Sequence, residues 1–175
     1  FAANKWFLLD SLSIFHLFIL NIVYLLSSIF ADLYFKKEIQ NNKISKEEIR
    51  IFSLLWLTAY FAMILVLISN NIGIMWVGMD TTTLLTAFLI CLHSNIYSLE
   101  AMWKYLIICS IGMAFALLGT ILVGVAAQNS ELTILNPLLW SELSQKAYLL
   151  NSQIMKAAFI FLIVGYGTKA GLAPM

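Results

Sequence analysis

Five long apolar segments constrain the fold of this chain more than any other feature of its sequence. About 20 consecutive apolar residues are enough for a helix to span the hydrocarbon core of a bilayer, and each segment is near or above that length. The sequence therefore predicts an all-α fold, a polytopic transmembrane helix bundle that forms a single domain over residues 1–175. The expected membrane spans are residues 11–34, 51–69, 72–92, 101–127 and 154–175.

The composition agrees with insertion into a lipid bilayer and argues against several other classes of protein. Hydrophobic residues make up 62% of the chain and charged residues 11%, with a mean hydropathy of +0.91, whereas soluble domains carry about 25% charged residues. The basic cluster is short and interleaved with acids, which argues against nucleic-acid binding. The sequence has no phosphate-binding glycine loop and no clustered metal ligands, so we expect neither a cofactor nor an active site in this chain.

Three side chains with reactive atoms fall inside the apolar segments. Cys91 and Cys109 are interpreted as buried thiols rather than as a disulfide or a metal site. His16 is interpreted as a packed, hydrogen-bonded core residue rather than as a ligand. We therefore include none of the three in the predicted site.

The charged connections between the spans orient the chain in the membrane. Residues 35–50 hold five of the ten basic residues, and the positive-inside rule assigns such a loop to the cytoplasm. The loop over residues 128–153 has one lysine and two glutamates, so it is predicted to lie on the outer side, together with the N-terminus. Within the basic loop, Ser45 and Glu48 fit a capping box that would begin a short helix. The five basic residues are Lys36, Lys37, Lys43, Lys46 and Arg50.

Asp80 lies well inside the third span, in the stretch "NIGIMWVGMDTTTLLTAFLICLH". A carboxylate at that depth is costly unless it faces the protein interior and finds a partner, and for this reason intramembrane acids are candidates for function. A structural alternative is that Asp80 is a hydrogen-bond anchor satisfied locally by Thr81, Thr82 and Thr83.

Glu100 and Lys104 stand four residues apart in the acid-first order that favours a pair on one helix face. Residues 105–127 are already long enough to span the membrane without a charge. Both side chains could therefore lie at the cytoplasmic interface, with Lys104 extending its ammonium toward water. The residues alone leave an intramembrane and an interfacial position equally open.

Lys169 is the most informative charge in the sequence. It lies thirteen residues after Lys156, about 20 Å along a helix, among small residues such as Gly167 that allow neighbouring helices to approach closely. Pro174 removes a backbone donor and is expected to break or kink the helix just past the lysine. A buried lysine whose neighbouring carboxylate moves or changes charge is a proton relay element. The alternative is that Lys169 lies near the cytoplasmic end and extends outward.

Three stretches resemble the antiporter-like, proton-translocating membrane subunits of respiratory complex I and membrane-bound hydrogenases, with hydrogenase-4 component F as the nearest branch. They are "NIGIMWVGMDTTTLLTAFLI", "SLEAMWKYLIICSIGMAFALLGT" and "VGYGTKAGLAPM", and "LLDSLSIFHLFI" resembles the Asp-x-x-Ser start of an early family helix. The resemblance extends over nearly the whole chain. It implies the inner (cell) membrane of a bacterium or archaeon and one five-helix repeat of the antiporter-like fold, whose last helix is broken near Lys169. Family members have about fourteen helices, so the chain is expected to be a fragment.

The resemblance also implies roles for individual residues. Asp80 resembles the family's acid, which is usually a glutamate, Lys104 resembles the lysine paired with it, and Lys169 resembles the lysine of the broken helix. Glu100, Gly167 and Pro174 are expected to support this relay. Because aspartate is one methylene shorter than glutamate, its reach toward Lys104 is reduced.

The function implied is proton translocation by a membrane subunit of an NADH-quinone oxidoreductase-like or hydrogenase complex. Other membrane and redox subunits would be its partners in the bilayer and would carry the electron-transfer chemistry. Two alternatives stay open: a structural membrane subunit that docks partners without moving ions, and a sodium/proton antiporter subunit of the same family.

Overall fold

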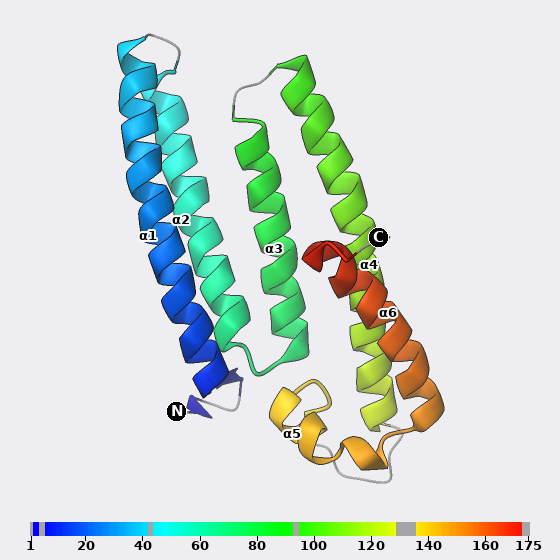
Figure 1. Ribbon diagram of the computed structural model, residues 1–175. Coiled ribbons are helices and arrows are strands. Elements are labelled where there is room, and N and C mark those ends of the chain that lie inside the picture. The colour runs from blue at the N-terminus through cyan, green and yellow to red at the C-terminus, as the bar shows by residue number, and fades with distance from the viewer. Residues whose placement is uncertain (1, 4–5, 42–43, 93–94, 129–135, 173–175) are drawn as a thin grey trace.

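The computed structural model describes residues 2–3, 6–41, 44–92, 95–128 and 136–172, and the chain is a bundle of long helices (Figure 1). The five long helices are α1 (Ser11–Gln40), α2 (Lys46–Ile68), α3 (Ile72–Ile90), α4 (Ile96–Gln128) and α6 (Ser152–Ala170). The shorter elements are α5 (Trp140–Gln145), the 3₁₀ helix η1 (Ala147–Leu149) and an antiparallel ribbon of β1 (Ala2–Ala3) and β2 (Phe7–Leu8).

Four of the long helices, α1 to α4, are long and apolar enough to cross a membrane. The prediction of an all-α polytopic bundle is therefore confirmed, and the chain is a multi-pass membrane protein. The fifth long helix, α6, has 19 residues and is not among these four in the part of the chain that the structure describes. Lys156, Lys169 and the polar residues of its first turn lower its hydropathy.

Three helices, α1, α2 and α4, extend beyond their predicted spans at the end of the bundle where α1 ends and where α2 and α4 begin (Figure 1). The 30 residues of α1 and the 33 residues of α4 correspond to about 45 and 50 Å of helix. Because the hydrocarbon core is about 30 Å thick, these ends project into the headgroup region or beyond it. Most of the basic segment over residues 35–50 is therefore helical, although its Lys43 lies outside the described residues.

The predicted capping box is present at the start of α2. The backbone N–H of Ser45 donates to Glu48 Oε2 at 2.7 Å, and the backbone N–H of Glu48 donates to Ser45 Oγ at 3.2 Å. The helix that begins there is a 23-residue membrane-length helix and not the short surface helix that the sequence suggested. The side chains of Ser45 and Glu48 thus accept hydrogen bonds from backbone N–H groups that have no partner within the helix.

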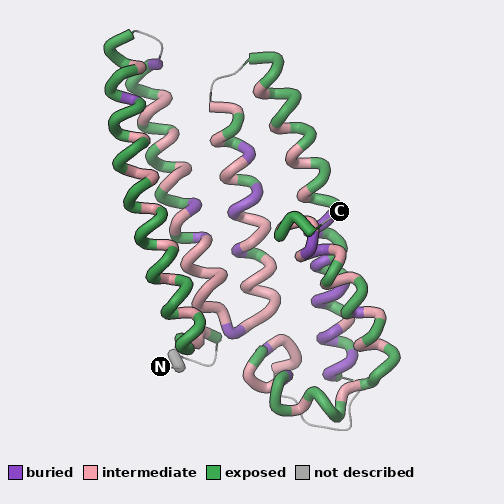
Figure 2. The backbone as a smooth tube through the Cα atoms, in the orientation of Figure 1, coloured by how far each residue is buried: buried purple, intermediate pink, exposed green. Residues whose placement is uncertain are grey.

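Small residues bring α4 and α6 into close contact. A Cβ on Gly165 would lie 2.3 Å from the backbone N of Ala116, and one on Gly119 would lie 2.8 Å from Leu162 Cγ. Ala116 and Ala158 are fully buried between the two helices. Figure 2 shows the buried residues of α4 concentrated along its half that packs on α6. This is the packing expected where small residues replace the hydrophobic effect as the basis of helix association in lipid.

Aromatic side chains fill the contact between α1 and α2 instead. Tyr24 stacks on Trp56 with ring centroids 4.5 Å apart, and Phe35 contacts Phe52 edge-on at 4.5 Å. The indole N–H of Trp56 donates to Ser28 Oγ at 3.0 Å, and the Tyr24 hydroxyl donates to the Trp56 carbonyl. Bulky rings hold these two helix backbones farther apart than glycine and alanine hold α4 and α6.

Asn70 connects three distant parts of the chain at one end of the bundle. It lies in the α2–α3 turn and is 4% exposed. Its backbone N–H donates to the Trp6 carbonyl at 2.8 Å, and its carbonyl accepts from the Trp140 N–H at 2.8 Å. Its side-chain amide both donates to Ser141 Oγ at 2.9 Å and accepts from the Ser141 N–H at 3.1 Å. The segment before α1, the α2–α3 turn and α5 are therefore fixed relative to one another.

Cys91, Cys109 and His16, which were not included in the predicted site, are less buried than predicted. Cys91 and Cys109 are free thiols of intermediate burial. His16 is exposed on α1, and its Nδ1 contacts the Leu12 carbonyl at 2.8 Å, so the prediction of a packed core histidine is wrong. α1 is an outer helix of the bundle, and most of its side chains have no neighbouring helix to pack against.

Candidate functional site

Lys169 lies in the last turn of α6, which ends at about mid-height of α3 and α4 (Figure 1). The helix stops at Ala170 because Gly171 adopts the left-handed conformation, with φ of 71°. The Leu172 N–H bonds to the Gly167 carbonyl at 2.9 Å, which is the Schellman arrangement for a glycine-terminated helix. Lys169 is thus held at a helix end inside the bundle. Pro174, to which the sequence interpretation attributed the break, lies outside the described residues.

The ammonium of Lys169 reaches across from α6 to α3. Its Nζ donates to Thr83 Oγ1 at 2.5 Å, and Thr83 is 2% exposed. The lysine also lines a cavity of about 260 Å³. The other residues around this cavity come from α1, α2 and α3 and are nearly all apolar: Leu20, Met63, Val66, Leu67, Met79 and Thr82.

Asp80 lies one helical turn before Thr83 and close enough to Lys169 for the two charges to interact. Within the described part of the chain its carboxylate makes no hydrogen bond and no ion pair. The threonines after it do not satisfy it, because Thr81 donates to the Val77 carbonyl while Thr82 and Thr83 donate to the Met79 carbonyl. The interpretation of these threonines as local partners of Asp80 is therefore wrong.

Lys104 pairs with Glu100, as their spacing indicated. The Nζ of Lys104 lies 2.5 Å from Glu100 Oε1, and the two side chains are 70% and 56% exposed. Both residues lie in the first turns of α4, and within the described residues neither forms a hydrogen bond or an ion pair with Asp80. The structure brings Lys169 near Asp80 but leaves Lys104 with a different acid.

Two hydroxyls near this site were not singled out in the sequence. Thr86 Oγ1 lies 2.9 Å from the Tyr105 hydroxyl, which joins α3 to α4. Cys109 lies one turn beyond Tyr105 on α4, near both Tyr105 and Lys169. The sequence places Tyr105 directly beside Lys104, which could have indicated that it belongs to the site. A tyrosine near a membrane interface is, however, usually an interfacial anchor.

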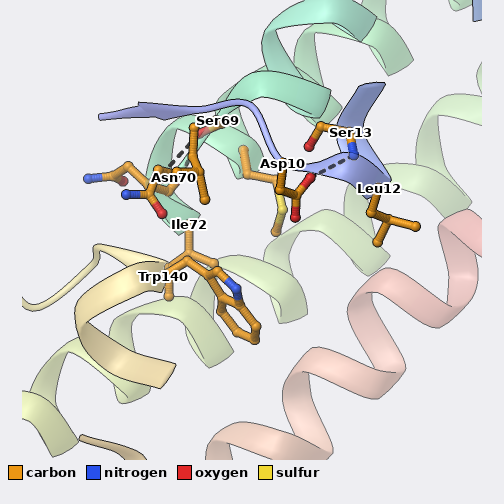
Figure 3. A pocket seen from close by; sticks show the side chains of 10 residues that line it. Asp10, Leu12, Ser13, Ser69, Asn70, Ile72 and Trp140 are labelled. Carbon is orange, nitrogen blue, oxygen red and sulfur yellow. Dashed lines mark hydrogen bonds between the residues drawn. The ribbon is translucent and has the colours of Figure 1, made fainter. Parts of the chain in front are cut away.

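A second cavity, of about 460 Å³, lies at the end of the bundle that Asn70 organises (Figure 3). Asp10 and Trp140 line it on opposite sides, above and below Ile72. Asp10 is the N-cap of α1, and its carboxylate accepts from the Ser13 N–H at 2.7 Å. These hydrogen bonds from Ser13 hold the pKa of Asp10 below its ordinary value. The carboxylate of the Asp-x-x-Ser stretch is therefore a helix cap that stays ionised at neutral pH.

The comparison with known proteins supports the likeness seen in the sequence. The chain is 35% identical over 172 residues to a hydrogenase-4 component F homolog from Methylacidiphilum infernorum. This alignment covers 98% of the chain and 36% of that relative. Hydrogenase-4 component F and its relatives are homologues of this chain. No family model matches it.

Two further relatives are named NADH-quinone oxidoreductase subunit N. The chain is 26% identical over 175 residues to the protein of Coxiella burnetii, covering 99% of the chain and 34% of that relative. It is 29% identical over 173 residues to the protein of Buchnera aphidicola, covering 95% of the chain and again 34% of the relative. The chain thus spans about a third of the length of the curated relatives it matches. The resemblance predicted from the sequence is confirmed at the level of these homologues.

Proposed function

We propose that this chain is part of a proton-translocating membrane subunit of an NADH-quinone oxidoreductase-like or hydrogenase complex. The observation that carries this proposal is a lysine at the end of a helix in the middle of the bundle, hydrogen-bonded to a buried threonine and close to Asp80. An ionisable pair at membrane depth is costly, and such residues mark ion pathways. The homology to hydrogenase-4 component F and to subunit N of NADH-quinone oxidoreductases supports the same function.

In this proposal Lys169 carries the proton and Asp80 controls how firmly it is held. While Asp80 interacts with Lys169, the ammonium has a counter-charge nearby. If Lys104 left Glu100 and neutralised Asp80, Lys169 would lose that counter-charge and release its proton. Charges in a medium of low effective dielectric constant interact by several kcal/mol at contact distance, which is enough to drive such a transfer. The arrangement with Lys104 on Glu100 corresponds to the proton-holding state.

The surroundings of the chain follow from the same proposal. The subunit would lie in the inner (cell) membrane of a bacterium or archaeon, with the N-terminus outside and residues 35–50 in the cytoplasm. Other membrane subunits would cover its exposed apolar helices, and redox subunits would carry the electrons. The chain itself would hold no redox group.

The test is to replace Lys169 by methionine in the complete complex and to measure the ratio of translocated protons to transferred electrons. We expect translocation to be abolished or sharply reduced, because methionine keeps the length of the side chain but cannot hold a proton. Lys156→Met is the matched control, since Lys156 is exposed at the other end of α6. An unchanged proton-to-electron ratio in Lys169→Met would refute the proposal.

The same experiment separates the two alternatives. A purely structural subunit predicts that Lys169→Met and Asp80→Asn change only the amount of assembled complex. A sodium/proton antiporter predicts that transport depends on the sodium concentration. Measuring assembly and sodium dependence alongside the proton ratio therefore distinguishes all three functions.

A further inference from the structure

A group of polar side chains joins three helices around Lys169. It consists of Thr83 and Thr86 on α3, Tyr105 and Cys109 on α4, and Lys169 on α6, and we call it the polar cluster. Lys169 donates to Thr83 at 2.5 Å, and Thr86 and Tyr105 share a hydrogen bond of 2.9 Å. Thr86 also lies 3.0 Å from the Thr83 carbonyl. The hydroxyls thus follow one another along α3 and cross to α4.

The position of the polar cluster matters because Asp80 and Lys104 are far apart along the helix axes. The hydrogen bond between Thr86 and Tyr105 fixes the level at which α3 and α4 meet. Asp80 lies six residues before Thr86 on α3, and Lys104 lies one residue before Tyr105 on the antiparallel α4. At 1.5 Å per residue the two residues are separated by about 10 Å along the bundle. With Lys104 bound to Glu100, this interval is therefore too long for a proton to cross in a single transfer.

The hydroxyls of Thr83, Thr86 and Tyr105 occupy that interval. Thr83 is 2% exposed and Thr86 and Tyr105 are partly buried, in a bundle whose other side chains at this depth are mainly apolar. A hydroxyl can accept a proton from one neighbour while it donates its own to the next. The Cβ atoms of Thr83 and Thr86, three residues apart on one helix, are about 5–6 Å apart, which one water molecule can bridge.

We propose that Thr83, Thr86 and Tyr105 form a hydroxyl path that conducts protons between Lys169 and the end of α4 that carries Glu100 and Lys104. Each step moves one proton onto a hydroxyl oxygen as another leaves it, so no group is oxidised or permanently charged. The path leads toward the end of the bundle where α1 ends and α4 begins (Figure 1). It rests on the proposed function, since it supplies Lys169 with the proton that is translocated.

Thr81 offers a control on the same helix. Its hydroxyl donates to the Val77 carbonyl at 2.8 Å, as those of the other threonines do to carbonyls of α3, but it makes no hydrogen bond to another helix within the described residues. Replacing Thr81 by valine therefore perturbs α3 in the same way as replacing Thr86, without touching the path.

The experiment measures proton translocation per electron in the complete complex carrying Thr86→Val, Thr86→Ser or Tyr105→Phe. Valine keeps the shape of threonine and removes the hydroxyl, whereas serine keeps the hydroxyl and changes the shape. We expect Thr86→Val and Tyr105→Phe to lower the number of protons translocated per electron roughly tenfold, the effect of one lost hydrogen-bonding group. Thr86→Ser and Thr81→Val are expected to translocate normally.

The outcomes separate the path from the function on which it rests. If Lys169→Met stops translocation while Thr86→Val and Tyr105→Phe translocate normally, the path is refuted and the function stands. If Lys169→Met also translocates normally, both are refuted. Should Thr86→Val fail to assemble, Tyr105→Phe decides the matter, because it leaves α3 unchanged. A defect of Thr86→Ser equal to that of Thr86→Val would also overturn the path, since it would show that shape and not the hydroxyl is required.

Discussion

The α4–α6 contact and the α1–α2 contact solve the same problem in opposite ways. Glycine and alanine let the backbones of α4 and α6 touch. In an apolar 18-residue stretch of α4, long enough to cross a membrane, 33% of the residues are buried. In α1 and α2, aromatic rings separate the backbones, none of the corresponding stretch of α1 is buried, and a cavity of about 400 Å³ lies between the two helices. The tight contact carries Lys169, whereas α1 and α2 contribute only apolar side chains that line the cavity beside it.

The difference between the two contacts indicates which helices must hold an accurate position relative to their neighbours. A hydrogen bond of 2.5 Å between α6 and α3 requires α6 to have a fixed position, and contact between backbones leaves little freedom to slide or rotate. The aromatic contact is adaptable by comparison, because stacked rings tolerate small shifts with little loss of energy. Two changes test this contrast and a third tests the cap of α1, in order of decreasing effect.

Gly165→Leu should break the tight contact. Even a Cβ at this position would lie 2.3 Å from the Ala116 backbone, so the two helices must separate, at a cost of about 3 kcal/mol or more. We expect a large fall in thermal stability in detergent and loss of proton translocation in the complete complex. Gly124→Ala is the matched control, because its Cβ would meet only the flexible Leu138 side chain at 3.3 Å. A Gly165→Leu protein as stable as the parent would show that α6 is not held in this way.

Trp56→Ala should weaken the open contact without affecting the site. The change removes the stacking on Tyr24 and the hydrogen bond to Ser28, at a cost of about 2 kcal/mol. Thermal unfolding should begin at a lower temperature, while the proton-to-electron ratio of assembled complex stays unchanged. A changed ratio would mean that the α1–α2 contact takes part in function and that the contrast between the two contacts does not hold.

The smallest effect should come from acidifying the cap of α1. Since the pKa of Asp10 is lowered in the folded chain, its stabilising contribution is present above the unfolded pKa and is lost as pH falls through the folded one. Stability should therefore decrease slightly below about pH 4. Asp10→Asn keeps a good N-cap and should remove this part of the pH dependence. Comparing unfolding curves of the two proteins between neutral and acidic pH measures it.

The sequence predicted the parts of this molecule that depend on local composition. The apolar segments became long helices, Ser45 and Glu48 formed their capping box, and Lys169 lies where a helix ends. These features follow from the hydropathy of a window or from residues three or four positions apart. The break near Lys169 was attributed to Pro174, whereas the described helix ends through the left-handed Gly171.

Partners on other helices could not be predicted in the same way. Thr83, which one alternative made a local partner of Asp80, accepts from Lys169, and neither Thr86 nor Tyr105 was part of the predicted site. Membrane helices are apolar on every side, so their sequences do not show which face meets a neighbour. The role of Asn70 depended on a turn contacting a segment about 70 residues away, which no local pattern encodes.

The left-handed glycine at the end of α6 has an electrostatic consequence. A helix that stops inside a bundle leaves the negative end of its dipole there, equivalent to roughly half an elementary charge. Lys169 is in the last turn of α6, so this partial charge acts on the lysine whatever the charge of Asp80. Part of the counter-ion of Lys169 is therefore built from backbone carbonyls, which cannot be titrated and do not depend on the movement of any side chain.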